Sequence, residues 1–202
     1  MEQGSKEWLE WRKTRVTGTD AGVLSGHSKF QTLDGLFKEK IGKKKPKAKT
    51  AAMQRGIDEE PKARALLEIM FGFINIKPLI CERESPFPAA ASLDGVFDSG
   101  SGKMDTLIEI KCPSSPRLLH LIQARKIPGD YYAQIQYQFF VSGIKRGIYA
   151  VYDGREINYI EVFPDYKFLL ILIKRCKAFA KCIENKTIDE IDISPIPFAH
   201  GT

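Results

Sequence analysis

Two short apolar segments joined by a turn rich in glycine and serine constrain the fold of this chain more than any other feature. The segments are residues 89–97 and 106–111, and the turn between them runs from Asp98 to Lys103. Its residues tolerate positive φ, which suits a hairpin. A third segment at 73–81 is β-branched and apolar enough for a strand. The pattern predicts an antiparallel meander of three strands.

Helical and turn patterns surround this meander. Helices are predicted at residues 5–15, 16–26 (with Thr17 or Thr19 as cap), 33–41, 59–71, 118–125, 131–142 and 166–184. Residues 146–152 and 156–163 predict a second hairpin across Asp153 and Gly154. We therefore expect one α/β domain over residues 1–202, a central mixed sheet flanked by helices, with its core at about 5–184 and a loosely packed tail at 185–202.

Length and charge narrow the class of protein. At 202 residues the chain is long enough for one domain with a buried core and short for two. The formal net charge is +6, which suits a polyanionic partner. Between Lys38 and Lys49, seven lysines stand against one acid, Glu39. This lysine-rich segment is either a solvated loop or a patch that follows DNA phosphates, and we favour DNA contact.

Cysteine and hydropathy patterns indicate a cytoplasmic protein. The four cysteines form no CxxC pair and no zinc-ligand spacing with histidine. Residues 1–15 are charged throughout, so no signal peptide is expected there. The longest wholly apolar run, residues 168–173, is too short to span a bilayer, so we expect no membrane association.

Two carboxylates and one ammonium are expected to meet on the predicted hairpin. Asp94 is predicted at the end of one strand, and Glu109 and Lys111 lie two apart on the next, on one face. Hard oxygen ligands suit Mg²⁺ or Mn²⁺, and a lysine there can orient or deprotonate a metal-bound water. The pattern is common, and its plainer interpretation is a surface Glu–Lys pair near a turn aspartate.

Further segments of the sequence argue against a mere surface Glu–Lys pair. The SLDG…EIKCP arrangement resembles the PD-(D/E)xK nuclease superfamily, specifically the lambda-exonuclease/YqaJ-like viral recombinase family. The segments EWLEWRKTRVTGTDA, RGIDEEPKARALLE and YYAQIQY also resemble this family, in the same order along the chain. Together they span Trp8 to Tyr152, about three-quarters of the chain. The resemblance implies a restriction-endonuclease-like core.

The resemblance also implies roles for individual residues near the metal. Metal ligands would be Asp94, Glu109, the Ile110 carbonyl and Glu60; Lys111 would be the catalytic lysine and Gln134 would contact the attacking water or the scissile phosphate. Taken alone, Glu60 could be a solvated acid and Gln134 a polar position on a half-buried helix. Pro61 restricts Glu60 to a helix start or a kink. The family's usual proline before the catalytic aspartate is Leu93 here.

Four more residues are implied to contact DNA. Arg12 would hold the 5′-phosphate of the digested strand, since a guanidinium fork suits paired phosphate oxygens. Thr19 is a small hydroxyl residue at a predicted helix start, and it could equally be only a cap. Ser92 would touch the substrate backbone, and Met53 would wedge against the terminal base pair, although a loop or core methionine is the plainer interpretation.

The implied activity is a processive, Mg²⁺-dependent 5′-to-3′ exonuclease that acts on linear double-stranded DNA ends with a 5′-phosphate and leaves 3′ overhangs. Mn²⁺ could substitute for Mg²⁺. The resemblance further implies a ring-shaped homotrimer, a single-strand annealing protein as partner, and a phage or prophage gene expressed in a bacterial cytoplasm. Two alternatives stay open: a sequence-specific endonuclease with the same core, and a non-catalytic scaffold that binds DNA ends.

Overall fold

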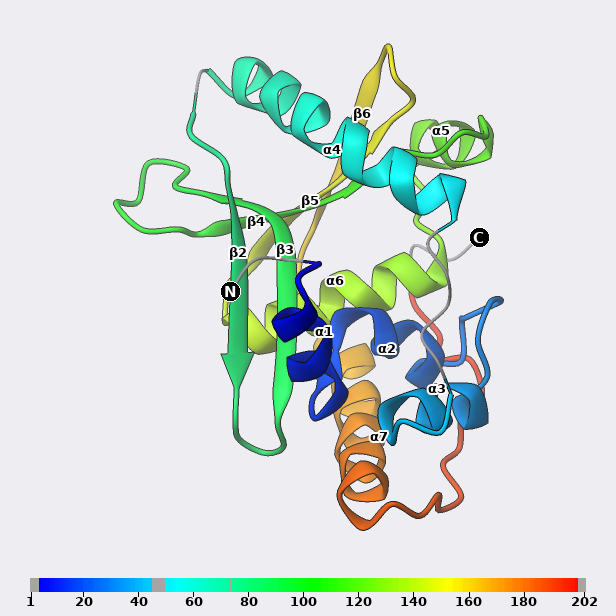
Figure 1. Ribbon diagram of the computed structural model, residues 1–202. Helices are drawn as coiled ribbons and strands as arrows, with labels where there is room; N and C mark the ends of the chain where they lie inside the picture. The colour runs from blue at the N-terminus through cyan, green and yellow to red at the C-terminus, as the bar shows by residue number, and fades with distance from the viewer. Residues whose placement is uncertain (1–3, 45–49, 73, 200–202) are drawn as a thin grey trace.

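The computed structural model describes residues 4–44, 50–72 and 74–199 (Figure 1). The helices are α1 (Lys6–Lys13), α2 (Gly18–Leu24), α3 (Leu33–Lys40), α4 (Ala51–Met70), α5 (Arg117–Gln123), α6 (Gly129–Ser142) and α7 (Tyr166–Asn185). The strands are β1 (Val16–Thr17), β2 (Lys77–Arg83), β3 (Ala89–Phe97), β4 (Thr106–Lys111), β5 (Arg146–Tyr152) and β6 (Ile157–Val162).

The strands form one mixed sheet in the order β1-β3-β4-β5-β6, with β2 also paired to β3. Strands β2, β3 and β4 run antiparallel, as the predicted meander requires, and β5 and β6 form the predicted second hairpin. Strand β5 runs parallel to β4 because the chain crosses over through α5 and α6 between them. The predicted class, a central mixed sheet flanked by helices, is confirmed.

Helices cover the two faces of the sheet unequally (Figure 1). Alternate residues of β4 and β5 divide between two cores, as side chains on a strand must. Leu107 and Tyr149 belong to the larger core, which α6, α2 and α7 complete. Ile108 and Ile148 belong to the smaller one, which α4 covers with Ala63 and Leu67 among others. The sheet is therefore the wall between two apolar layers.

Helix α4 begins well before the sequence predicts. Its N-cap is Thr50, whose hydroxyl accepts a hydrogen bond from the Met53 N–H at 3.2 Å. Pro61 lies inside the helix and cannot donate to the carbonyl one turn earlier. Of the two alternatives predicted for Glu60, a helix start is wrong, because α4 carries Glu60 in its middle; a kink at Pro61 stays a prediction.

Helix α2 starts with a cap at Thr17, one of the two caps predicted. The Thr17 N–H donates to the carboxylate of Asp20, three residues on, at 2.7 Å. Thr19 lies within the helix, so its hydroxyl is available to other partners. Thr17 is thus the cap, and Thr19 is not.

The tail packs more closely than the sequence predicts. Ile196 is buried, and its N–H donates to the Ser25 carbonyl at 3.0 Å. Phe198 stacks on Tyr132, with ring centroids 4.4 Å apart. Gly26, at φ +80°, permits this approach, because a Cβ there would lie 2.2 Å from the Ile193 carbonyl oxygen. The expectation of a loose tail is corrected at Ile196 and Phe198, whose apolar surface binds the segment to the core.

Two further properties of the described residues concern the cysteines and the length of apolar helices. All four cysteines are free thiols. Within residues 4–44, 50–72 and 74–199, no helix is both long and apolar enough to cross a membrane.

A single buried hydroxyl links α6 to β1. Tyr137 is fully buried, and its hydroxyl donates to the Val16 carbonyl at 2.8 Å. Tyr137→Phe should lower the free energy of unfolding by about 1–2 kcal/mol, because the buried carbonyl loses its hydrogen bond. Urea denaturation measures this, with Tyr159→Phe at a 39% exposed tyrosine as the control. Equal losses in the two variants would contradict the account.

Candidate active site

The predicted catalytic residues come together where β3 and β4 separate. The two strands pair only from Gly95–Ile108 to Phe97–Thr106. Asp94 lies just beyond the last pair, and its Oδ2 accepts a hydrogen bond from the Ile110 N–H at 2.8 Å. Asp94 was predicted at the end of a strand; it lies inside β3, at the end of the paired region.

Glu109 and Lys111 share one face of β4, as their spacing predicts. The Lys111 ammonium forms an ion pair and hydrogen bond with Glu109 Oε1. Glu109 is 1% exposed and Asp94 is 9% exposed, so both carboxylates are buried. A buried carboxylate requires hydrogen bonds or a counter-charge. Glu109 receives its counter-charge from Lys111 on the same strand, and Asp94 receives a hydrogen bond from the neighbouring strand.

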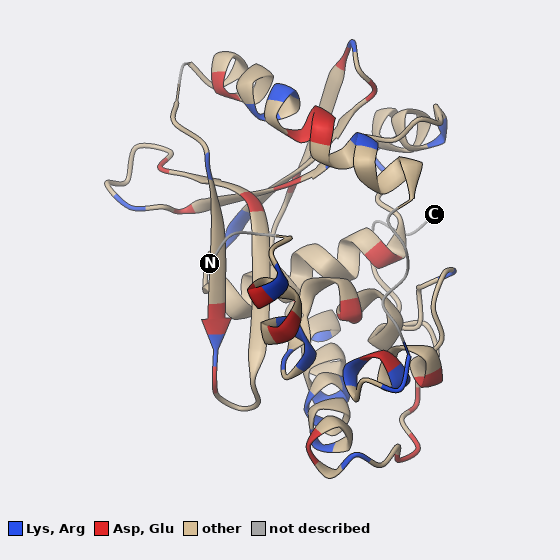
Figure 2. Cartoon of the chain, viewed as in Figure 1, with Lys and Arg blue, Asp and Glu red and all other residues tan. Residues whose placement is uncertain are grey.

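Helix α4 brings a third carboxylate to this place. Glu60 forms an ion pair with Arg64, one turn further along the helix. The Nε of Arg64 donates to the Asp94 carbonyl at 2.9 Å. Arg64 therefore connects the helix that carries Glu60 to the strand that carries Asp94. Figure 2 shows acidic positions on α4, β3 and β4.

Helix α6 closes the site with residues one turn apart. The Gln134 side-chain oxygen accepts a hydrogen bond from Lys111 Nζ at 3.3 Å. The Gln138 amide donates to Glu109 Oε2 at 2.5 Å. Tyr131 places its ring 4.7 Å from Lys111 Nζ, within cation–π range. Gln134 is predicted from the sequence, and Gln138 and Tyr131 are not, although the four-residue spacing of Gln134 and Gln138 puts both on one helix face.

Negatively charged side chains are crowded together in the site. Burial raises the pKa of Asp94 well above its ordinary value, and the charges of Glu109 and Glu60 raise it further. Burial also raises the pKa of Glu60, against the effect of Arg64. Burial lowers the pKa of Lys111, but Glu109 and Asp94 together outweigh it, so the net shift is upward. The Lys111 ammonium and the Arg64 guanidinium thus offset the three carboxylates of Asp94, Glu109 and Glu60.

The donor set fits a hard divalent cation. Asp94 uses Oδ2 for the Ile110 amide and Glu60 uses Oε1 for Arg64, so each carboxylate has a second oxygen for a further ligand. Both oxygens of Glu109 contact protein donors. As the side chains lie in the described ranges, no three His, Cys, Asp or Glu residues are placed so that together they could hold a metal ion. The chemistry of these oxygens suits Mg²⁺ or Mn²⁺.

The residues predicted to bind the 5′-phosphate also lie together. Arg12 Nη2 donates to Thr19 Oγ1 at 2.6 Å and to Thr17 Oγ1 at 3.3 Å. The Arg12 guanidinium lies 4.3 Å from the centroid of the Trp8 ring. The Trp8 Nε1–H donates in turn to Ser92 Oγ at 3.1 Å. Trp8, which the sequence analysis assigned no role, connects Arg12 to the strand of Asp94.

A buried ion pair holds this arginine's backbone in place. Lys40 Nζ lies 2.5 Å from Asp20 Oδ2 and donates to the carbonyls of Arg12 and Arg15 at 2.9 and 2.8 Å. Burial lowers the pKa of Lys40, and the charge of Asp20 partly restores it. The expectation that the lysine-rich segment is a solvated loop or a DNA patch is therefore wrong for Lys40. Residues 45–49 of that segment lie outside the described residues.

Met53 occupies the first turn of α4 and is 55% exposed. Met53 is therefore neither a loop nor a core methionine, and its contact with the terminal base pair stays a prediction.

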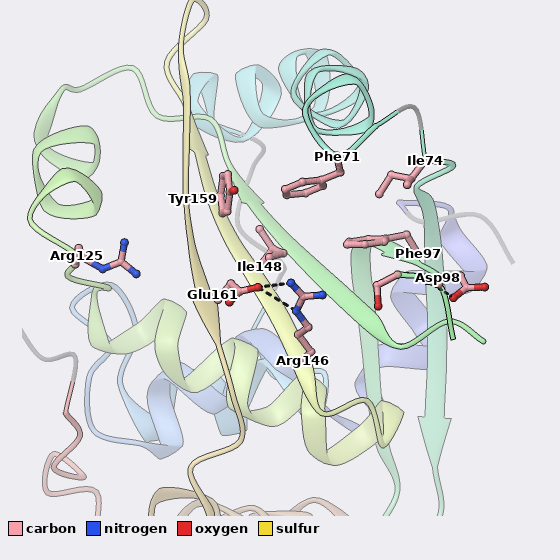
Figure 3. Close-up of a pocket in the computed structure, with 11 residues that line it drawn as sticks. Phe71, Ile74, Phe97, Asp98, Arg125, Arg146, Ile148, Tyr159 and Glu161 are labelled. Carbon is pink, nitrogen blue, oxygen red and sulfur yellow. Dashed lines mark hydrogen bonds and ion pairs between the residues drawn. The ribbon is translucent and has the colours of Figure 1, made fainter. Parts of the chain in front are cut away.

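A cavity of about 810 Å³ lies away from these residues, toward the other end of the strands (Figure 3). Its lining includes Phe71, Phe97 and Tyr159, together with the ion pair of Arg146 and Glu161. None of the predicted site residues lines this cavity. The catalytic assignment therefore rests on the carboxylate cluster rather than on the size of a pocket.

No curated protein matches the chain. Crystal structures of an alkaline exonuclease from Laribacter hongkongensis, alone and in complex with dAMP, superpose with a TM-score of 0.75 at 23% identity, covering 90% of this chain and 94% of that one. A phage-related exonuclease from Haemophilus somnus superposes with a TM-score of 0.63 at 14% identity, covering 85% and 94%. These likenesses show a shared fold.

A model of the YqaJ-like viral recombinase domain matches residues 7–145, a range that includes most of α1, the Asp94 strand, the Glu109–Lys111 strand and α6. With more than half of the chain matched, the protein belongs to the YqaJ-like viral recombinase family.

Proposed function

We propose that the protein is a metal-dependent exonuclease that digests the 5′-ended strand of linear double-stranded DNA and leaves 3′ single-stranded overhangs. The observation that carries this proposal is the adjacency of two sites. Glu109, Lys111 and Asp94 form a buried carboxylate–ammonium cluster, and Ser92, two residues before Asp94, accepts a hydrogen bond from the tryptophan that stacks on Arg12.

In this proposal Asp94, Glu109, Glu60 and the Ile110 carbonyl hold Mg²⁺, with Mn²⁺ as a substitute. A divalent cation bound there would stabilise negative charge on the scissile phosphate. Lys111 donates hydrogen bonds that orient the attacking water, and Gln134, which already contacts Lys111, fixes the direction of that donation. Both side chains come from rigid elements, so the reacting groups are held before substrate arrives.

Arg12 supplies the direction of digestion. Its guanidinium is presented by Thr17, Thr19 and Trp8 and remains charged at any physiological pH. A terminal 5′-phosphate offers the paired oxygens and the extra negative charge that such a fork binds best. Met53 would press against the terminal base pair from the start of α4.

The same proposal extends to the oligomeric state, the protein partner and the cellular location. A ring-shaped homotrimer around DNA would make digestion processive, because a tethered enzyme meets each next phosphate at high effective concentration. A single-strand annealing protein would receive the 3′ overhang, in the bacterial cytoplasm where a phage or prophage gene is expressed. A light-scattering mass of three chains supports the ring, and a mass of one chain contradicts it.

One experiment compares substrates side by side. Linear duplex with 5′-phosphate, linear duplex with 5′-hydroxyl and closed circular duplex are incubated with Mg²⁺ and with a chelator. We expect rapid digestion of the phosphorylated linear DNA with Mg²⁺ and none with the chelator. Cutting of closed circles would replace the proposal with an endonuclease, and inactivity on all three would indicate a non-catalytic scaffold.

Replacing Trp8, the tryptophan beside Arg12, should raise the KM for DNA ends moderately. Trp8→Phe removes the indole N–H that Ser92 accepts and weakens the stacking on Arg12. We expect the KM for 5′-phosphorylated ends to rise about 3- to 10-fold, the effect of one hydrogen bond and part of a cation–π contact. Trp11→Phe is the matched control, because Trp11 donates to Glu82 and stacks on Arg15 instead. A similar rise in both variants would remove Trp8 from the phosphate site.

A further inference from the structure

Helix α6 carries two buried glutamines, Gln136 and Gln138, that serve different parts of the molecule. Gln136 donates to the Phe163 carbonyl at 2.9 Å and accepts from the Asp165 N–H at 2.7 Å, which fixes the start of α7. Both of its polar atoms are satisfied by backbone groups. Gln136 is therefore a structural glutamine.

Gln138 is directed toward the candidate active site. Its side-chain nitrogen donates to Glu109 Oε2 at 2.5 Å and to the Ser92 carbonyl at 3.4 Å. Glu109 and Gln138 are each 1% exposed, so water does not compete for this contact. The two hydrogens of one amide group thus reach both strands that carry the carboxylate cluster.

The other end of the same amide is unsatisfied. Gln138 Oε1 is buried and has no hydrogen-bond partner among the described residues. An unpaired buried carbonyl costs free energy, so the fold gains less from this amide than it would from one whose two polar atoms were both paired. A buried polar atom without a hydrogen bond departs from ordinary packing. Such a departure is expected where function requires a particular chemical group.

We propose that Gln138 is a positioning residue that holds the Glu109 carboxylate in the orientation needed to bind the metal. This inference rests on the proposed function, because it assigns a role in holding the same cation. Lys111 holds Oε1 of Glu109 and Gln138 holds Oε2, so the carboxylate plane is fixed from two sides. If a divalent cation took the place of the ammonium at Oε1, the Gln138 amide would still hold Oε2 and so keep the orientation of the carboxylate. Partners that orient a ligand in this way commonly contribute 10- to 100-fold to metal affinity.

The test measures metal binding without DNA or turnover. Mn²⁺ is titrated into the wild-type protein, Gln138→Met and Gln136→Met, and free Mn²⁺ is followed by electron paramagnetic resonance. Methionine keeps the length and buried volume of glutamine and removes the amide. We expect Gln138→Met to bind Mn²⁺ at least about tenfold more weakly. Gln136→Met should lose thermal stability and bind Mn²⁺ like wild type.

Gln138→Asn provides a second variant should the methionine variant fail to fold. It keeps an amide in the buried position and withdraws the donor from Glu109 by one methylene, so it should also weaken Mn²⁺ binding. Unchanged Mn²⁺ affinity in a folded Gln138 variant overturns the inference and leaves the proposed nuclease standing. Equal weakening in Gln136→Met also overturns it, since the effect would then come from helix packing. Absence of Mn²⁺ binding by the wild type overturns the metal assignment as well.

Discussion

Lys111→Met is expected to lower kcat on 5′-phosphorylated linear duplex by about 10²- to 10⁴-fold, the range for loss of a positioned proton donor or charge at a reacting group. Lys111 supplies the ammonium that Glu109 and Gln134 both contact. Methionine fills the same space without charge, so the loss would report the ammonium. Single-turnover digestion with saturating Mg²⁺ measures the chemical step.

Lys103→Met is the matched control for this variant. Lys103 is exposed on the turn between β3 and β4, and the same substitution there should leave kcat unchanged. Because Lys111 neutralises the buried Glu109, thermal unfolding of both variants separates lost chemistry from lost folding. A folded Lys111→Met protein that retains wild-type kcat would contradict the catalytic assignment.

Arg12→Gln is expected to remove the preference for a 5′-phosphate. Activity on phosphorylated duplex should fall about 10- to 100-fold, which corresponds to charge-assisted hydrogen bonds of about 1.5–3 kcal/mol. Activity on 5′-hydroxyl duplex should change little, because that end offers no terminal phosphate to the guanidinium. The ratio of the two initial rates is the measurement.

Arg15→Gln is the control for the arginine variant. Arg15 lies three residues on and pairs with Glu82 and Glu84, so its guanidinium is engaged elsewhere. The Arg15 variant should keep the preference for phosphorylated ends. If Arg15→Gln abolished the preference and Arg12→Gln did not, the phosphate site would have to be reassigned.

The sequence predicts five strands of the sheet because their signals are local, but it misses β1, whose residues Val16–Thr17 were expected at the start of a helix. The meander and the second hairpin follow from short apolar segments and turn residues, and their pairing is confirmed. The start of α4 could not be predicted in the same way. Its first turns carry exposed Met53 and Ile57 and little apolar periodicity, and Pro61 suggests a boundary where the helix continues. The surrounding structure decides that boundary.

The residues of the candidate site also divide into those that the local sequence predicts and those that it does not. Asp94, Glu109 and Lys111 are predictable because one hairpin brings them together. Gln138, Trp8 and Lys40 act through contacts with residues far from them in sequence, such as Gln138 with Glu109 and Trp8 with Ser92. The four-residue spacing from Gln134 puts Gln138, and not Gln136, on the face of α6 toward the site, but that spacing does not reveal the contact with Glu109. The packing of Ile196 on Ser25 escaped the sequence for the same reason.

The most direct test of the central claim is strand-resolved digestion of a linear duplex. One strand carries a 5′-phosphate at an open end, its complement is protected at its own 5′ end by phosphorothioate linkages, and the two strands bear different internal labels. With Mg²⁺, we expect the phosphorylated strand to be lost from its 5′ end while the complement survives as intact single-stranded DNA. Loss of the protected strand from its 3′ end, or equal loss of both strands, would contradict a 5′-directed exonuclease.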